Sequence, residues 1–585
     1  MLHTNNKPFA AFACLVTFLA FAQVVFAQAQ AASAYETTEQ REPCAKHNPE
    51  RNAYFGDLHI HTRYSLDAAT QDTRTSPADA YRFAKGERIP VQPYNEAGEG
   101  MRSLQLERPL DFAGVTDHAE LFGELNICRT PGLEGYNSWE CKIFRNWNRG
   151  AFFLFNTSAS LFKTHLGLCG EDGIRCERET RNVWKTMQEQ AEAAYDRTEE
   201  CSFTSFIGYE WTGSGTAAAN LHRNVIFRNR NVPEKPFTFI DGPAAPTLWD
   251  ALDEQCVDAG IGCEVVVIPH NSNISNGLMF QLNNLDGSPL NSAEAKQRAR
   301  LERLVEVMQH KGSSECYFGL GSEDELCDFE QLPYDTFGGQ MNPLLRKLPS
   351  PNDGFLRGVL SDGLSQEGDI GVNPFKWGFI GSTDTHIAAA GGVQEQGFLG
   401  HGGAGKPAKK GELPKGLPDN LEFNPGGLAV LWAEENSRDA LFAAMQRREA
   451  YGTSGPRIEL RVFAGEGIPA DICASPNFAK IGYELGVPMG GDLQGATAGA
   501  PRFAITALKD AGVSGKNGMD LERVQIIKGW LAADGSKQEK VYDVANYTEQ
   551  NSQNGGAQAG VDPLSCKVYG EGFKSLCNTW QDPEF

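Results

Sequence analysis

The chain has 585 residues, with 53 Lys and Arg against 75 Asp and Glu, for a formal net charge of -22. This acidic balance argues against nucleic-acid binding, because neutralising phosphates requires a basic surface. It does not exclude an anionic small-molecule substrate, since bound metal ions reverse the local charge. The length is sufficient for a large core and for more than one domain.

Residues 1–27 have the composition of a signal peptide. Lys7 is the only charged residue among them, and an apolar stretch over residues 9–26 ends at the small residue Ala27. A membrane anchor is the alternative, but Gln23 interrupts the stretch, which is short for a span of about 20 residues. We therefore expect a cleaved signal, a periplasmic or secreted protein, and no other membrane segment.

Cysteines are frequent after the expected signal. Cys14 lies within the signal, so 13 of the 14 cysteines remain, and in an oxidising compartment this number predicts disulfides. An odd number leaves at least one thiol unpaired. The connectivity stays open, but we expect five close pairs: Cys128 with Cys141, Cys169 with Cys176, Cys256 with Cys263, Cys316 with Cys327, and Cys566 with Cys577.

Short apolar runs, most of them followed by polar side chains, occur throughout residues 45–456. They cover residues 53–55, 112–115, 203–209, 265–268, 304–308, 377–380 and 428–432, and the last has no polar cluster. Helical patterns fall between several of them, at 77–85, 179–198, 293–303 and 437–448. This alternation predicts an α/β fold, and polar groups at the strand ends favour a barrel with its site at one rim. An open doubly wound sheet is the alternative.

Three other regions differ in composition from these βα repeats. Residues 119–200 hold four cysteines and irregular aromatic-rich sequence, which predicts an insertion at the rim, and residues 391–427 are typical of a long Gly- and Pro-rich loop. Residues 457–585 predict a small β-rich C-terminal domain, with strand-like runs at 458–462, 503–505 and 524–530 and a hairpin turn at Asp534-Gly535.

His59 and His61 indicate a metal site. They alternate along an expected strand, so both imidazoles point to the same side. This spacing is common by chance, but other potential ligands also follow apolar runs: Asp67, Asp117, His118, Glu210, His222, His270, Asp384 and His386. Structural histidines near a rim would not be expected to gather in this way, so we interpret the set as metal ligands.

The motifs His59-x-His61, Thr116-Asp117-His118 and Asp384-Thr385-His386, together with Asp67, Glu210 and His270, resemble the PHP (polymerase and histidinol phosphatase) superfamily. The phrases around them, at residues 54–62, 207–211 and 381–386, are most similar to an exported family of unknown function numbered 3604. The resemblance covers about residues 45–585. It implies a distorted seven-stranded βα barrel with two or three divalent metal ions and, in many relatives, phosphoester hydrolysis.

The resemblance also implies an assignment of ligands. A first metal would be held by His59, His61, Glu210 and Asp384. Glu210 would bridge to a second metal, held also by His222 and His270; His222 is chosen by its order in the chain. A third metal would be held by Asp67, His118 and His386, with Asp67 standing where many relatives have His.

Mixed imidazole and carboxylate ligands suit Zn, Mn or Fe. A hydroxide bridging two such ions would be the nucleophile. We expect Asp117 to orient an imidazole rather than bind metal. His310 is a candidate proton donor to the substrate or leaving group, with a structural role as the alternative. Arg457 would clamp a phosphate oxygen or, alternatively, would close the barrel against the C-terminal domain.

The function expected from these residues is that of an exported phosphoesterase acting on a small, anionic substrate. A metal-dependent carboxylic ester or amide hydrolase is the alternative enzyme, because the same metal chemistry attacks carbonyl groups. A metal-loaded binding protein without turnover is an alternative of another class. The extent of the ligand set argues against it, and so does a carboxylate placed to bridge two metals.

Overall fold

The computed structural model describes residues 35–584, apart from 285, 343, 345–346, 348–353, 395–397, 399, 403–422, 496–498, 546–559, 563–564 and 566. The expected signal over residues 1–27, most of the loop expected over 391–427, and Cys566 therefore lie outside the described residues. No helix in the described part of the chain is long and apolar enough to cross a membrane.

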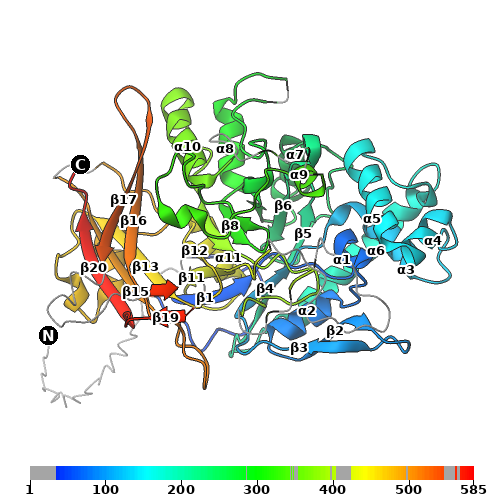
Figure 1. Ribbon diagram of the computed structural model, residues 1–585, viewed down its shortest axis with the longest axis horizontal. Coiled ribbons are helices and arrows are strands. Elements are labelled where there is room, and N and C mark those ends of the chain that lie inside the picture. Colours follow the sequence, from blue (N-terminus) through cyan, green and yellow to red (C-terminus); the bar gives the residue numbers. More distant parts are fainter. Residues whose placement is uncertain are drawn as a thin grey trace, which may run out of the picture.

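Strands and helices alternate through the first three quarters of the chain (Figure 1). The strands of this part are β1 (Asn52–Asp57), β2 (Ile89–Tyr94), β3 (Gly100–Leu104), β4 (Phe112–Val115), β5 (Thr204–Trp211), β6 (Arg223–Phe227), β7 (Val265–Pro269), β8 (Leu304–Gln309), β9 (Gly312–Ser313), β10 (Gly378–Gly381), β11 (Leu428–Ala433) and β12 (Ala450–Thr453). The helices are α1 (Leu66–Thr70), α2 (Pro77–Ala84), α3 (Phe122–Arg129), α4 (Trp139–Asn146), α5 (Asn148–Asn156), α6 (Ile174–Ala194), α7 (Ala245–Leu252), α8 (Ser292–Leu301), α9 (Phe337–Met341), α10 (Leu356–Ile370) and α11 (Arg438–Arg447). All seven expected apolar runs fall on strands.

The central sheet has seven strands in the order β12-β11-β1-β4-β5-β6-β7. β1, β4 and β5 pair in parallel, whereas β6, β11 and β12 pair antiparallel to their neighbours. A second sheet, β10-β8-β9, lies across the open side, with β8 beside β7 and β10 beside β12. The α/β class is confirmed and the sheet is curled. The described strands do not form the predicted ring of seven parallel βα units, because several neighbouring strands of the sheet pair antiparallel.

Both faces of the curled sheet are buried, which explains the continuous apolar runs in its strands. One face packs against Tyr81 and Phe83 of α2 and Trp184 of α6. The other face contributes a separate core in which residues such as Leu58 and Phe206 pack against α11. With both faces covered, only the strand ends remain to form a site.

The C-terminal part is rich in strands, as the sequence predicts. Its elements are β13 (Glu459–Gly465), α12 (Phe478–Leu485), β14 (Val487–Pro488), β15 (Arg502–Leu508), β16 (Val524–Leu531), β17 (Lys537–Ala545), β18 (Gly560–Asp562), β19 (Lys567–Tyr569) and β20 (Ser575–Gln581). The order β14-β13-β15-β20 forms an antiparallel sheet, and β16 and β17 form the hairpin expected at Asp534-Gly535. These strands occupy one end of the molecule in Figure 1.

The segment expected to be an irregular insertion, residues 119–200, is largely helical. It contains α3, α4, α5 and α6, which lie at the opposite end of the molecule from the C-terminal strands (Figure 1). Two short-range disulfides, Cys128–Cys141 and Cys169–Cys176, are buried in its core. A short π-helical turn (Thr157–Phe162) follows α5 directly.

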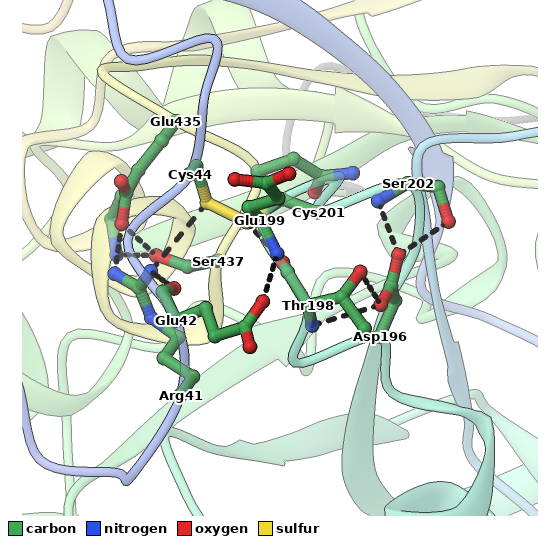
Figure 2. Close-up of a disulfide and its surroundings, with 12 residues drawn as sticks. Arg41, Glu42, Cys44, Asp196, Thr198, Glu199, Cys201, Ser202, Glu435 and Ser437 are labelled. Carbon is green, nitrogen blue, oxygen red and sulfur yellow. Dashed lines mark hydrogen bonds and ion pairs between the residues drawn. A yellow bond between two sulfur atoms is a disulfide. The ribbon is translucent and has the colours of Figure 1, made fainter.

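Six disulfides are present among the described residues, and they indicate an oxidising compartment. Four of the five expected pairs are confirmed. The fifth is wrong, because Cys577 is bonded to Cys473, 104 residues away. The sixth disulfide, Cys44–Cys201, joins the N-terminal segment to the loop before β5 (Figure 2). Close spacing along the sequence can predict short-range pairs only. The two long-range disulfides, Cys44–Cys201 and Cys473–Cys577, therefore could not be predicted from it.

Candidate metal centre

The nine expected ligands meet at one end of the curled sheet, although they come from distant parts of the sequence. His59 and His61 follow β1, Asp67 lies in α1, His118 follows β4, Glu210 lies in β5, His222 precedes β6, His270 follows β7, and Asp384 and His386 follow β10. Six of the nine are fully buried, and Asp67, His118 and His222 are partly buried. Every one belongs to at least one group of residues whose ligand atoms lie close enough to hold an ion.

Four of these side chains form a compact group. Oδ1 of Asp384 lies 3.0 Å from Nε2 of His61 and 3.3 Å from Nε2 of His59. Oε2 of Glu210 lies 3.3 Å from each of the same two nitrogens. All four atoms are buried, and none has a hydrogen-bond partner in the described structure. Ligands bound at about 2.1 Å to one ion lie about 3.0–3.4 Å apart, so the group fits a metal.

The second oxygen of Glu210 faces different histidines. Its Oε1 atom lies 2.6 Å from Nδ1 of His222 and 3.1 Å from Nε2 of His270. Burial raises the pKa of Glu210, but the imidazoles of His118, His270 and His222 lower it well below its ordinary value. The carboxylate is therefore ionised. Its Oε1 atom faces His222 and His270, whereas its Oε2 atom faces His59, His61 and also Nδ1 of His118, 3.3 Å away.

A further group surrounds Asp67. Its Oδ2 atom lies 2.7 Å from Nε2 of His386 and 3.2 Å from Nε2 of His118. His61 lies close to this group as well as to the first one. The sequence predicts it as a ligand of the first ion only, whereas in the structure its imidazole also lies within reach of an ion held by Asp67, His118 and His386. Burial and the nearby imidazoles of His386 and His118 lower the pKa of His61 to about 3. His61 is consequently neutral, which is the form that binds metal.

Asp117 is linked to His61 through one intervening hydroxyl. Ser65 donates from Oγ to Oδ1 of Asp117 at 2.9 Å and accepts the backbone N–H of His118 at 3.0 Å. A serine has one hydroxyl proton, so Nδ1 of His61, 2.7 Å away, is the donor in its contact with Ser65. Nε2 of His61 is left with a lone pair directed at Glu210 and Asp384. An orienting role for Asp117 would act through this hydrogen-bond chain, and the role itself stays a prediction.

The loop that carries Asp384 is fixed by a carboxylate that the sequence reasoning missed. Asp57 accepts hydrogen bonds from the backbone N–H of Thr383 at 3.2 Å, from the Thr383 hydroxyl at 2.6 Å and from the N–H of Gly391 at 2.8 Å. Asp384 has φ of 54°, in the left-handed region that Asp tolerates better than most residues. Asp57 stands two residues before His59, at the end of β1, which is the signal that would have found it.

Two residues around Asp384 were also missed. Glu306 in β8 lies 3.1 Å from Nδ1 of His59, and Lys311 contacts Oδ2 of Asp384. Glu306 is a carboxylate within an apolar strand, and a buried charge of this kind requires a partner, so its position was a usable signal.

His310 does not line the cavity over the metal centre. It is fully buried, with Nε2 3.3 Å from Oδ2 of Asp384, and burial lowers its pKa well below the ordinary value. Its role as a proton donor stays a prediction.

Arg457 lies away from the metal centre. Its guanidinium donates to the carbonyl oxygens of Arg108 at 2.8 Å and Pro109 at 2.7 Å, and its backbone N–H donates to Asp510. These contacts join the loop before β4 to the start of the C-terminal strands. They match the structural alternative for Arg457, and this residue does not line the cavity.

A cavity of about 500 Å³ lies over the metal centre. Its floor is polar and includes His59, His118, Glu210 and Asp384, together with Lys311. Residues of α5 and of the turn that follows it form a wall, so the insertion over 119–200 does border the site. The volume is sufficient for a small-molecule substrate.

A curled α/β sheet with a cluster of histidines and carboxylates at one end defines an α/β protein with a candidate metal centre. The chain belongs to the family described as a protein of unknown function, DUF3604, which matches residues 48–585. No curated protein is significantly similar. The chain is also similar to a two-domain protein of Bacteroides vulgatus ATCC 8482 containing a predicted PHP-like metal-dependent phosphoesterase, at 10% identity and a TM-score of 0.28, over 93% of this chain and 100% of that one. A TM-score of 0.28 is too low to establish a common fold.

Proposed function

We propose that the protein is an exported metal-dependent hydrolase, and specifically a phosphoesterase that uses two or three divalent ions of Zn, Mn or Fe. The observation that carries the proposal is that Nε2 of His59 and Nε2 of His61 each lie 3.0–3.3 Å from both Oε2 of Glu210 and Oδ1 of Asp384. The absence of hydrogen bonds to these buried atoms in the described structure supports the same conclusion, because buried polar atoms are otherwise satisfied.

The candidate ligands divide into three groups, one for each proposed ion. His59, His61, Glu210 and Asp384 would hold the first ion, Glu210 with His222 and His270 the second, and Asp67 with His118 and His386 the third. When bound, such ions activate water as a nucleophile and stabilise negative charge on the substrate oxygen. Glu306, Ser65 and Asp117 hold the imidazoles of His59 and His61 in the required orientation.

Lys311 is placed to assist an anionic substrate. It lines the cavity beside Asp384 and is the only lysine among the cavity residues of the described structure. The overall charge of -22 disfavours an anion at long range, so the bound ions and Lys311 would provide the local attraction. Six disulfides support a periplasmic or secreted location, which completes the proposal.

The test begins with metal content. The purified protein is stripped with a chelator, reloaded with Mn²⁺, Zn²⁺ or Fe²⁺, and assayed on p-nitrophenyl phosphate, bis(p-nitrophenyl) phosphate, p-nitrophenyl acetate and an anilide. We expect bound metal and metal-dependent hydrolysis of a phosphate ester. If only the acetate or the anilide is hydrolysed, the protein is a carboxylic ester or amide hydrolase and not a phosphoesterase.

A matched pair of variants tests the position of the site. His59→Ala should lower kcat/KM by at least about 100-fold, because it removes a ligand of the first ion. His47→Ala changes an exposed histidine outside the cluster and should leave activity unchanged. Equal activity of His59→Ala and the wild type on every substrate would refute the proposed site.

A further inference from the structure

The cavity over the metal centre has two chemically different sides. Its floor consists of the histidines, carboxylates and Lys311 described above. The other side, the wall, carries mostly apolar side chains, and the aromatic ones come from α5, from the loop before α7 and from α9; α5 also contributes Arg149 and Asn156. The larger apolar side chains that line the cavity are Leu66, Leu121, Phe152, Phe153, Leu161, Phe239 and Phe337.

Part of this wall is exposed to solvent. Phe153 in α5 is 44% exposed, and Leu161 in the turn after α5 is 67% exposed. Exposed apolar surface that lines a concave site is favourable to cover, because each Å² removed from water contributes about 25 cal/mol. The wall borders the metal centre directly, so a molecule bound at the floor has this surface within its reach.

A turn that also lines the cavity, next to α9, is held in a fixed conformation. Ala217 and Ala218 line the cavity and have φ of 56° each, in the left-handed region that alanine rarely adopts. α9 packs against this turn, and a Cβ atom at Gly338 would lie 2.3 Å from the carbonyl oxygen of Ala217. Strained backbone of this kind is typical of sites that clamp a ligand.

We propose that the substrate is amphipathic: the anionic group attacked at the metal centre is attached to an aryl or alkyl group that packs on the wall formed by α5 and the turn over Thr157–Phe162. The proposal rests on the proposed function and adds the substrate class to it. Sugar or glycerol esters, whose alcohol part is polar, would leave this wall uncovered and are disfavoured.

Binding of non-hydrolysable probes tests the proposal without turnover. Phenylphosphonate and methylphosphonate share the anionic group and differ in its apolar substituent. Calorimetric titration of the metal-loaded protein should give at least tenfold tighter binding of phenylphosphonate, in line with the discrimination that an apolar pocket provides. Equal affinities would overturn this inference alone. Absence of binding by both, with no phosphate ester hydrolysed, would overturn the proposed function as well.

Variants of the wall provide the second measurement. Phe152→Ala and Leu161→Ala alter side chains that line the cavity, whereas Phe162→Ala alters the next residue of the same turn, which is 66% exposed and does not line it. We expect the two wall variants to raise KM for phenyl phosphate at least about fivefold, with little change in kcat and in KM for glycerol phosphate.

Phe162→Ala should match the wild type on both esters, and melting curves would confirm that all three variants are folded. If the wall variants change both esters equally, or change neither, the wall does not recognise the substrate.

Discussion

Glu306 lies with Oε2 3.1 Å from Nδ1 of His59, and both side chains are fully buried. The ionised carboxylate of Glu306 can only accept a hydrogen bond, so Nδ1 of His59 carries the proton in this contact. The Nε2 atom, on the other side of the ring, is left to face Glu210 and Asp384.

Glu306→Gln should weaken metal binding without removing a ligand. An amide is a poorer acceptor than a carboxylate, and loss of such an orienting partner typically costs about 10–100-fold in metal affinity. Competition with a chromogenic chelator would measure the change. Glu189→Gln, on the exposed side of α6, is the control. Unchanged affinity in Glu306→Gln would show that His59 does not depend on this carboxylate.

Asp67→Ala tests the third ion separately from the first. Asp67 is the only carboxylate in the group that it forms with His61, His118 and His386. Its loss should lower the metal content by one ion per chain, while the group around Glu210 stays loaded. Elemental analysis of the reloaded protein measures this, with Asp72→Ala, whose carboxylate pairs with the exposed Arg74, as the control. A metal content equal to that of the wild type would remove the third ion from the proposal.

Most of the ligand set could be predicted because its signal is local. His59, Glu210 and His270 each stand at the end of a buried apolar run, and such runs end at one edge of a sheet. Glu306 was missed because it lies inside its run rather than after it. A carboxylate inside an apolar run indicates a buried partner, but which residue that partner is, here His59, depends on the tertiary structure.

The topology was harder to predict than the strands themselves. β6 follows β5 after a connection of only 11 residues and pairs with it antiparallel, which a parallel βα repeat does not allow. Which cysteines form a disulfide also depends on the tertiary structure. Cys577 lies 11 residues from Cys566 in sequence, yet it is bonded to Cys473 next to β20.

The Cys44–Cys201 disulfide should contribute more to stability than a short-range one. It closes a loop of 157 residues, whereas Cys256–Cys263 closes one of 7. Closing the longer loop removes more entropy from the unfolded chain, with a typical contribution of about 2–5 kcal/mol. The backbone around it is also held by Glu42, which accepts from the N–H of Glu199 at 2.9 Å (Figure 2). Serine replacement of both cysteines in each pair, followed by denaturant unfolding, measures the difference.

The paired replacement at Cys44 and Cys201 should lower the free energy of unfolding more than that at Cys256 and Cys263. The two variants lack the same number of sulfur atoms, and the two disulfides differ most in the length of the loop that they close. An equal loss in both would show that the long-range disulfide acts only through local contacts.

Glu302 should make stability depend on pH in the acid range. It is fully buried, with Oε1 2.8 Å from Nε of Arg223 and Oε2 2.9 Å from Nε of Arg298. Burial raises the pKa of Glu302, but the two guanidinium groups outweigh it and hold the pKa below 4.5. The unfolded chain therefore takes up this proton first as the pH falls. The stability that Glu302 contributes is present above about pH 4.5 and is lost as the pH falls through the folded-state pKa.

Glu302→Gln leaves two buried guanidinium groups without their carboxylate, and breaking a buried pair costs about 3–5 kcal/mol. Urea unfolding at pH 7, 5, 4 and 3.5 should show that loss at pH 7 and a smaller difference from the wild type at pH 3.5, because the wild type loses part of the stability contributed by ionised Glu302 as the pH falls below about 4.5. Glu189→Gln should follow the wild type at every pH. If the Glu302→Gln variant and the wild type lose stability in parallel between pH 5 and 3.5, Glu302 does not have the lowered pKa that its two arginine partners imply.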